Sequence, residues 1–223
     1  MSDAKKILIV FPEDPSTTFL EEVISYLFQS VHSSLFTFLK INADDKSHQL
    51  TIEQIQNPIY NTIVFIGHGT SVALYGAYTS EYKNEKFITI KNFPVFDGKE
   101  LLLVSCYSSS LLNRVKLQKF SKGMGFGDLP TDWNDIQSAR EHDVDAYKGF
   151  TESTIETFRK CLIEIIKYSL SDFLNNNLEL KELQALIVLR INKRIAKYYT
   201  ENRIGNIPLS DALFKMKQEI AFF

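Results

Sequence analysis

Cysteine is scarce in this sequence: only Cys106 and Cys161 occur among its 223 residues. Two cysteines do not make a disulfide framework, and the first residues, MSDAKK, contain no apolar core of a signal peptide. We therefore expect a cytoplasmic protein of a reducing compartment, in which both thiols are free. One of the two thiols can then be kept for its reactivity.

Long apolar runs and an excess of charge of either sign are also lacking. The longest apolar runs, such as residues 63–66 and 101–104, are far too short to span a bilayer. The 25 basic and 27 acidic residues leave a net charge of -2, which favours neither nucleic acid nor an anionic membrane. We expect no direct nucleic-acid binding and no membrane attachment.

Signals for metals and nucleotides are missing as well. The histidines do not fall at metal-ligand spacings, and no paired-cysteine motif occurs. The glycines of GMGFG at 123–127 have the wrong spacing for a dinucleotide fingerprint, and no Gly-rich loop with Lys and Ser or Thr is found. We expect no metal site and no cofactor.

What the sequence does have is the hydrophobic pattern of an α/β fold. Short apolar segments predict strands, and apolar residues at helical spacing predict amphipathic helices. We expect strands at residues 6–11, 35–41, 62–66 and 100–105, and helices at 19–31, 51–56, 153–174 and 180–199. Near-continuous apolar strands predict a mainly parallel central sheet with helices on both faces. The expected fold is a single three-layer α/β/α domain spanning residues 1–223.

Local signals suggest the structure of several connecting segments. Asp14 and Pro15 are typical of a helix N-cap and a first helical residue. A small hairpin is expected within residues 72–90, and the glycine-rich region 122–149 predicts a long loop. The structure of residues 206–223 is left open, and for their last four residues, IAFF, there are three interpretations: an edge strand, a docking tail or a cap on the core.

Two of the expected strands end directly at reactive side chains. His68 stands between two glycines after the segment 62–66, and Cys106 follows the segment 100–105. If these strands are parallel neighbours, the two residues emerge side by side where open α/β sheets bind ligands. The imidazole can then act as a base or stabilise a thiolate that attacks a carbonyl carbon. The N–H groups of Gly69 and Cys106 can approach the resulting oxyanion.

The order of these motifs resembles the caspase-like cysteine peptidases. The motifs are an apolar strand followed by HG at 68–69, and a later apolar strand followed by SCYS at 105–108. The sequence looks closest to the bacterial CHAT domains, which are related to separase. The segment KGMGFGDLPTD at 122–132 resembles the strand and loop that follow the cysteine in that family. The similarity spans roughly residues 63–175.

This resemblance implies a cysteine endopeptidase and assigns roles to individual residues. Cys106 would be the nucleophile, His68 the base or ion-pair partner, and Gly69 an oxyanion donor. Many relatives have a glycine two residues after the cysteine, where this sequence has Ser108. The shape of the loop behind the nucleophile is therefore open, and Ser105 and Ser108 are expected to line the substrate pocket.

The resemblance also implies substrates and partners. Family members cut after acidic or basic residues and use a pocket of opposite charge. Three aspartates after the cysteine could bind a basic side chain of the substrate: Asp128, Asp132 and Asp135, of which Asp132 is taken as a substrate-binding residue. If the substrate side chain is acidic, Arg114 would bind it instead. We expect a protein or peptide substrate, a protein activator or complex partner, and a role as an effector in bacterial antiviral defence or cell death.

Two other interpretations remain open. The same fold can serve as an interaction module in which His68 and Cys106 catalyse no reaction. The presence of both residues and of Gly69 counts against this interpretation. The chain can also be an unrelated flavodoxin-like regulatory or ligand-binding domain, in which His68 and Cys106 are incidental. A single cysteine after an apolar strand is more often a small core residue, and a lone histidine beside glycines more often belongs to a turn. We expect Cys161, beside the apolar stripe of a helix, to be inert packing.

Overall fold

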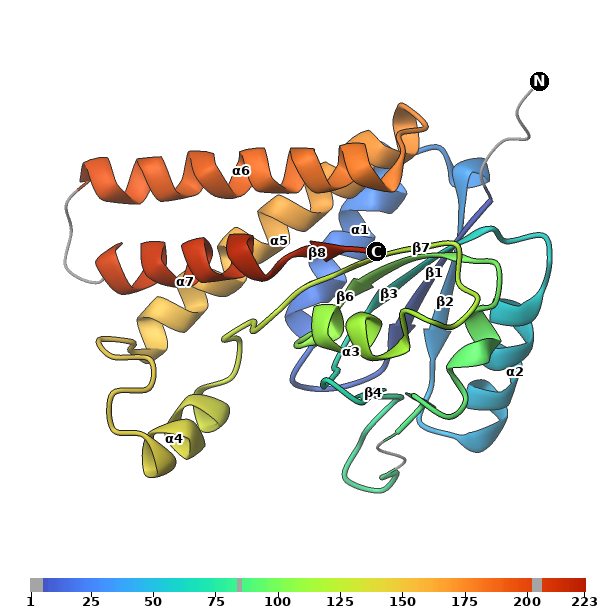
Figure 1. Cartoon of the computed structure of the whole chain (residues 1–223), viewed down its shortest axis with the longest axis horizontal. Helices are drawn as coiled ribbons and strands as arrows, with labels where there is room; N and C mark the ends of the chain where they lie inside the picture. The colour runs from blue at the N-terminus through green and yellow to red at the C-terminus, as the bar shows by residue number, and fades with distance from the viewer. Residues whose placement is uncertain (1–5, 84–85, 202–205) are drawn as a thin grey trace.

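The computed structural model describes residues 6–83, 86–201 and 206–223. Its central sheet has six strands in the order β2-β1-β3-β6-β7-β8, all parallel except β8 (Figure 1). The strands of this sheet are β1 (Ile7–Pro12), β2 (Phe36–Ile41), β3 (Thr62–Ile66), β6 (Glu100–Val104), β7 (Lys122–Gly125) and β8 (Ala221–Phe222). The strands β4 (Ala73–Leu74) and β5 (Ile88–Thr89) form the separate antiparallel hairpin that the sequence predicted. The α-helices are α1 (Glu21–Ser30), α2 (Asp45–Gln56), α3 (Ser108–Val115), α4 (Trp133–His142), α5 (Glu152–Asn175), α6 (Leu180–Glu201) and α7 (Asn206–Glu219).

Helices cover both faces of the sheet and give the molecule three layers. In β3, Ile63 and Phe65 contact a hydrophobic cluster that includes residues of α2 and α3. Val64 and Ile66 contact a second cluster, which includes residues of α1, α5, α6 and α7. Figure 1 shows these helices as ribbons beside the sheet. Because successive side chains of a strand point to opposite faces, a strand covered on both sides is apolar throughout. The predicted three-layer α/β/α fold with a mainly parallel sheet is confirmed.

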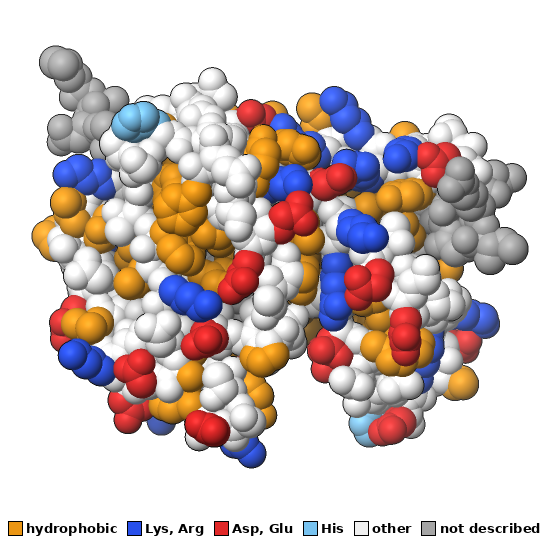
Figure 2. Space-filling model, turned by 180° about the vertical axis from the view of Figure 1, so that it is seen from behind, with side chains coloured by type: hydrophobic (Ala, Val, Ile, Leu, Met, Phe, Trp, Pro, Cys, Tyr) orange, Lys and Arg blue, Asp and Glu red, His pale blue; other side chains and the backbone are white. Residues whose placement is uncertain are grey.

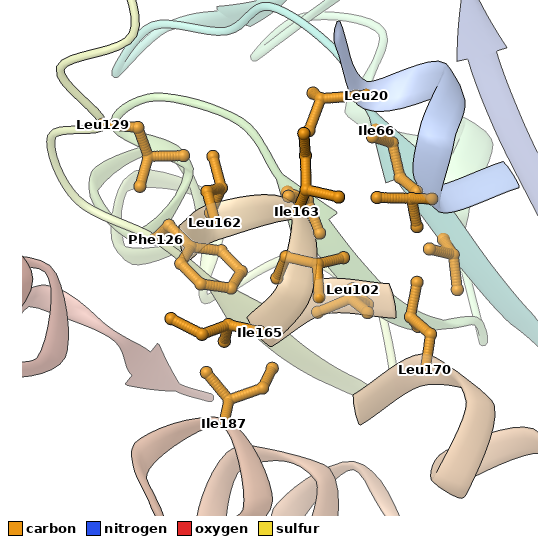
Figure 3. Close-up of a cluster of buried hydrophobic side chains, with 14 of the residues drawn as sticks. Leu20, Ile66, Leu102, Phe126, Leu129, Leu162, Ile163, Ile165, Leu170 and Ile187 are labelled. Carbon is orange, nitrogen blue, oxygen red and sulfur yellow. The ribbon is translucent and has the colours of Figure 1, made fainter. Parts of the chain in front are cut away.

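The longest helix, α5, supplies much of the core on the second face. Figure 3 shows Leu162, Ile163 and Ile165 of α5 in the same cluster as Ile66 and Leu102 of the sheet. Each fully buried aliphatic side chain contributes about 1.5–3 kcal/mol, so this contact is a main source of stability. Neither α5 nor any other helix in the described ranges is long and apolar enough to cross a membrane.

The long loop predicted at residues 122–149 is wrong, because this region contains both β7 and α4. Atoms of Leu112 and Phe120 would lie 3.0 Å from a Cβ added at Gly123. This glycine therefore permits close packing on β7 and does not mark a turn. The helix α4 buries only Ile136, so it lacks the apolar periodicity that identifies a helix from sequence.

The predicted helix N-cap at Asp14 is also wrong. A 3-10 turn at Thr18–Leu20 precedes α1, which begins at Glu21. The carboxylate of Asp14 accepts hydrogen bonds from the N–H and the hydroxyl of Ser16, at 2.8 and 2.6 Å. Aspartate often closes a local turn of this kind. Asp14 is thereby held at the end of β1 and is not part of a helix.

The last residues of the chain form an edge strand, which is one of the three structures considered for them. After α7, β8 pairs with β7 in antiparallel fashion. The pairing continues to Phe223, which exchanges two backbone hydrogen bonds with Gly123 at 2.8 and 2.9 Å. The short β8 covers an otherwise open edge of the sheet. This pairing also joins the C-terminus to β7, the strand that precedes the loop at residues 126–132.

Candidate active site

The carboxyl ends of three parallel strands bring candidate residues together at one edge of the sheet. The strands β3 and β6 are in parallel register, with Ile66 opposite Val104. His68 and Cys106 each stand two residues beyond that pair, so they follow equivalent positions of neighbouring strands. Asp14 follows β1 on the other side of β3. This edge includes the point between β1 and β3 where the strand order reverses, at which open α/β sheets bind ligands.

A cavity of about 530 Å³ opens at this edge. Its described lining includes His68 and Cys106 together with three aspartates, Asp14, Asp128 and Asp135, and no lysine or arginine. Figure 2 shows the surface hollowed between two lobes, one on the side of α4 and the other on the side of the hairpin β4–β5. A cavity of this size is large enough for a small ligand or the side chains of a peptide.

Cys106 lines the cavity as a protonated thiol. Its Sγ donates a hydrogen bond to the carbonyl oxygen of Leu129 at 3.4 Å, and the described structure contains no hydrogen bond between Cys106 and His68. Burial, opposed by the hydrogen bond to Leu129 and aided by the negative charges of Asp128 and Asp135, raises the pKa of Cys106 to about 12. The thiol is therefore uncharged at neutral pH in this conformation.

The imidazole of His68 is held from the side of β1. Its Nε2 is in hydrogen-bond contact with the hydroxyl of Ser16. Behind Ser16, Asp14 accepts from the same hydroxyl, and its other carboxylate oxygen lies 3.9 Å from Nε2 of His68. The side chain of His68 is 32% exposed and that of Asp14 is 10% exposed. The three side chains form a hydrogen-bonded series from the edge of the cavity into the protein.

Gly69 lies close to the residues that end β6. A Cβ added at Gly69 would meet the Ser105 hydroxyl oxygen at 2.7 Å and the Cys106 carbonyl oxygen at 3.2 Å. A side chain at position 69 would therefore push the two strand ends apart. Within the described ranges, neither the N–H of Gly69 nor that of Cys106 donates a hydrogen bond to another residue. Both donors can thus serve an oxyanion on a ligand.

The chain turns sharply directly after Cys106. Tyr107 has a φ of 55°, in the left-handed region, and is the N-cap residue of α3. A bulky residue is strained in this conformation, and its N–H is held by the carbonyl oxygen of Gly127 at 2.7 Å. The turn leaves Cys106 between β6 and α3 at the cavity. Such strained positions occur preferentially at functional sites.

The aspartates of the cavity differ in whether they have partners. The buried carboxylate of Asp128 accepts from the Tyr147 hydroxyl at 2.5 Å and forms an ion pair with Lys215 at 2.9 Å. Asp135 is exposed on the first turn of α4 and makes neither a hydrogen bond nor an ion pair with another described residue. Partial desolvation raises the pKa of Asp135, and the charge of His68 opposes this change. Asp135 is the aspartate left free for a ligand.

No family model matches this chain. No curated protein matches it either. In the described part of the chain, no group of three or more His, Cys, Asp or Glu side chains is placed to hold a metal ion. The geometry of the strand ends is therefore the main support for a functional proposal.

Several residues predicted to contact substrate do not line this cavity: Ser105, which is buried, Ser108, Asp132 and Arg114. Ser108 is fully buried at the start of α3, where its hydroxyl donates to the carbonyl oxygens of Leu103 and Ser105 at 2.7 and 2.8 Å. Asp132 is the N-cap of α4 and accepts from the N–H of Asn134 at 2.7 Å. Asp132 lines a neighbouring pocket that includes His68, but it is not among the residues around Cys106.

The sequence contained a signal for the residues that were missed. Ser16 and Asp14 follow β1, just as His68 and Cys106 follow β3 and β6. The strand-end rule applies to them equally, but the cap interpretation of Asp14 concealed it. No sequence signal identifies Tyr147, which reaches the site from the segment between α4 and α5.

Proposed function

We propose that this chain is a cysteine endopeptidase in which Cys106 is the nucleophile and His68 transfers protons. One observation carries the proposal: the two residues follow paired positions of β3 and β6 and line the same cavity. The N–H groups of Gly69 and Cys106, neither of which donates to another described residue, support it as oxyanion donors. The resemblance of the HG and SCYS motifs to caspase-like peptidases points to the same chemistry.

The proposed reaction is acyl transfer followed by hydrolysis. The sulfur of Cys106 attacks a peptide carbonyl carbon while its proton passes to His68. As the C–N bond breaks, His68 gives that proton to the leaving amine, and the acyl group stays on Cys106 as a thioester. Water then attacks the thioester and gives a proton to His68. The C–S bond breaks, the carboxylic acid leaves, and the sulfur regains its proton.

We propose that the enzyme cleaves after lysine or arginine residues of its substrates. The described cavity lining carries three aspartates and no basic residue other than His68. Asp128 already has Tyr147 and Lys215 as partners, so Asp135 is the residue best placed to accept a substrate cation. A carboxylate pairs well with the guanidinium of arginine because both groups are planar and bidentate.

We further propose that the isolated enzyme cleaves slowly and that a protein partner raises its activity. Burial, together with two aspartates, raises the pKa of Cys106 to about 12, which disfavours the attacking thiolate. A partner or substrate that neutralises Asp135 would remove one of these effects. The caspase-like effectors of bacterial defence and cell death, which this sequence resembles, are switched on by a partner or by cleavage. Growth arrest on expression of wild type, but not of Cys106→Ala, would support such a role.

The central test compares wild type, Cys106→Ala and Cys161→Ala on a peptide library with acidic, neutral and basic residues at the cut site. We expect cleavage after basic residues by wild type and Cys161→Ala only, detected by mass spectrometry. Equal cleavage by wild type and Cys106→Ala would mean that Cys106 is not the nucleophile. Cleavage after acidic residues would refute the proposed charge preference.

The raised pKa of Cys106 and the missing hydrogen bond to His68 favour one competing function, an interaction module with an idle pair. Such a module would bind its partner equally well as wild type and as Cys106→Ala, and it would form no thioester. Incubation with peptide aldehydes distinguishes the two, because a reversible adduct on Cys106 requires a nucleophilic sulfur. Absence of any adduct at any pH between about 6 and 9 would favour the module.

A further inference from the structure

We infer that Ser16 and Asp14 are positioning residues of the active site, which orient His68 so that Nδ1 accepts the proton of Cys106. This inference rests on the proposed function, because it concerns the proton acceptor of the same pair. It adds a third strand end, that of β1, to the two that carry the HG and SCYS motifs. Neither motif assigns a role to Ser16 or Asp14.

The direction of the hydrogen bonds follows from the number of protons available. A serine hydroxyl has one proton, and Ser16 donates it to Asp14 Oδ1 at 2.6 Å. The oxygen of Ser16 must therefore accept at its contact with His68, which places a proton on Nε2. A neutral imidazole carries a single ring proton. Nδ1 is then the unprotonated nitrogen and the one able to act as a base.

Asp14 also stabilises the protonated, positively charged form of His68. When the imidazole takes a second proton it becomes positive, and Asp14 Oδ2 lies 3.9 Å from Nε2. The carboxylate is 10% exposed, so water screens this attraction only in part. The charge of Asp135 reaches His68 from α4 on the other side of the cavity. The imidazolium formed after proton transfer is therefore stabilised by two carboxylates.

The sheet holds this arrangement in place independently of His68. The N–H of Glu13 donates to the carbonyl oxygen at the end of β2 at 2.8 Å. Within the turn, the N–H of Thr17 donates to the Asp14 carbonyl oxygen at 3.1 Å. Because these contacts fix the backbone on both sides of Asp14, Ser16 is presented to His68 by the end of β1. Preorganisation of this kind is what a positioning residue provides.

The first test observes the Nε2 proton of His68 by NMR in ¹⁵N-labelled protein. Wild type should show a downfield Nε2–H resonance that exchanges slowly with water. Ser16→Ala should lose it, and Ser16→Thr, which keeps a hydroxyl, should restore it. Thr18→Ala is the matched control, since it removes a hydroxyl that donates to the Asp14 carbonyl oxygen at 3.2 Å and leaves Ser16 untouched. A wild-type proton on Nδ1, or an unchanged resonance in Ser16→Ala, would overturn the inference.

The second test measures whether the arrangement acts on the thiol, without any substrate. Alkylation of Cys106 by iodoacetamide should slow about tenfold in Ser16→Ala and in Asp14→Ala, because a misplaced base assists proton removal less. Ser16→Thr and Thr18→Ala should react at the wild-type rate. Equal alkylation rates in wild type, Ser16→Ala and Asp14→Ala would show that the two residues do not act through His68.

Peptide cleavage by the same variants separates this inference from the proposed function. A positioning role lowers kcat in Ser16→Ala and leaves KM nearly unchanged. If wild type cleaves no peptide but Ser16→Ala loses the resonance and slows alkylation, the peptidase proposal fails and the positioning role stands. If wild type cleaves and Ser16→Ala keeps the full kcat, the peptidase stands and the positioning role fails.

Discussion

The two cysteines occupy regions of opposite character. Cys106 follows a central strand at the mouth of a cavity, where Asp128 and Asp135 add to the burial that raises its pKa. Cys161 lies in the middle of α5, is 2% exposed, and contacts the hydroxyl of Tyr198 at 3.3 Å. Burial raises the pKa of Cys161 too, although the Tyr198 hydrogen bond and nearby cations oppose this. Both thiols are protonated at rest, so access and environment, not resting charge, distinguish them.

This difference suggests what each region can do. Burial on a packed helix protects a thiol until the helix opens. A strand end keeps the thiol at the surface of a cavity, where a change of occupant alters the charges around it. We therefore expect Cys106 to respond to pH and to nearby carboxylates, and Cys161 to respond to conditions that loosen packing.

The largest expected effect is on alkylation rates. With a pKa of about 12 in place of the ordinary 9.0, Cys106 has about 1,000-fold less thiolate at neutral pH than a free thiol. Its reaction with iodoacetamide should therefore rise about tenfold per pH unit from about pH 7 to 10. Urea below the unfolding transition should accelerate only Cys161. Mass spectrometry of the two labelled peptides gives both rates, and a Cys106 rate independent of pH above neutrality would indicate a preformed thiolate instead.

The second prediction concerns the pH dependence of stability. The pKa of Cys106 is higher in the folded protein than its ordinary value of 9.0, so the folded state binds this proton more tightly. The stabilisation is complete below pH 9 and is lost as the pH rises toward 12, by about 1.4 kcal/mol per unit for one group. Between about pH 8 and 10.5, urea unfolding of Cys106→Ala should therefore depend less steeply on pH than that of wild type. Parallel curves would mean that Cys106 is solvated like a free thiol.

The same contrast between strand ends and packed helices explains how far the sequence could be interpreted. The strands β1, β3 and β6 were predictable because their residues are apolar on both faces, and each is buried over nearly its whole length. The placement of His68 and Cys106 at one edge then followed from parallel pairing. The long helices α5 and α6 were predictable from apolar spacing alone.

Elements that depend on distant partners were not predictable from composition and periodicity, although the family resemblance implied a strand near residue 122. The short β7 contains two glycines and is a strand because β6 and β8 pair with it. Likewise, α4 buries one residue, Ile136, and its helical form gives little apolar periodicity. Asp14 follows a strand end but also precedes Pro15 as a helix cap would, and its contact with Ser16 decides between the two interpretations. Long-range pairing and side-chain competition decide these cases, and neither has a local sequence signature.

A third prediction compares two acidic residues of the same helix. Asp135 lines the cavity, whereas Glu141, which is also exposed on α4, does not. Asp135→Asn should lower the ratio of kcat/KM for arginine over glutamine substrates about tenfold, which is typical of losing a charged hydrogen-bond partner. Glu141→Gln should leave the ratio unchanged. Equal effects of the two substitutions would show that the preference comes from the overall field of the protein.

The fourth prediction concerns the ion pair behind the cavity. Lys215 pairs at 2.9 Å with Asp128, whose side chain is 7% exposed, whereas Lys148 pairs at 2.9 Å with Asp145, which is 70% exposed. Removal of Lys215 leaves a shielded carboxylate with tyrosine hydroxyls as its side-chain partners, so Lys215→Ala should cost about 1–2 kcal/mol in unfolding free energy. Lys148→Ala should cost less than about 0.5 kcal/mol, because solvent screens exposed pairs. Urea denaturation measures both, and equal costs would indicate that water reaches Asp128 as freely as Asp145.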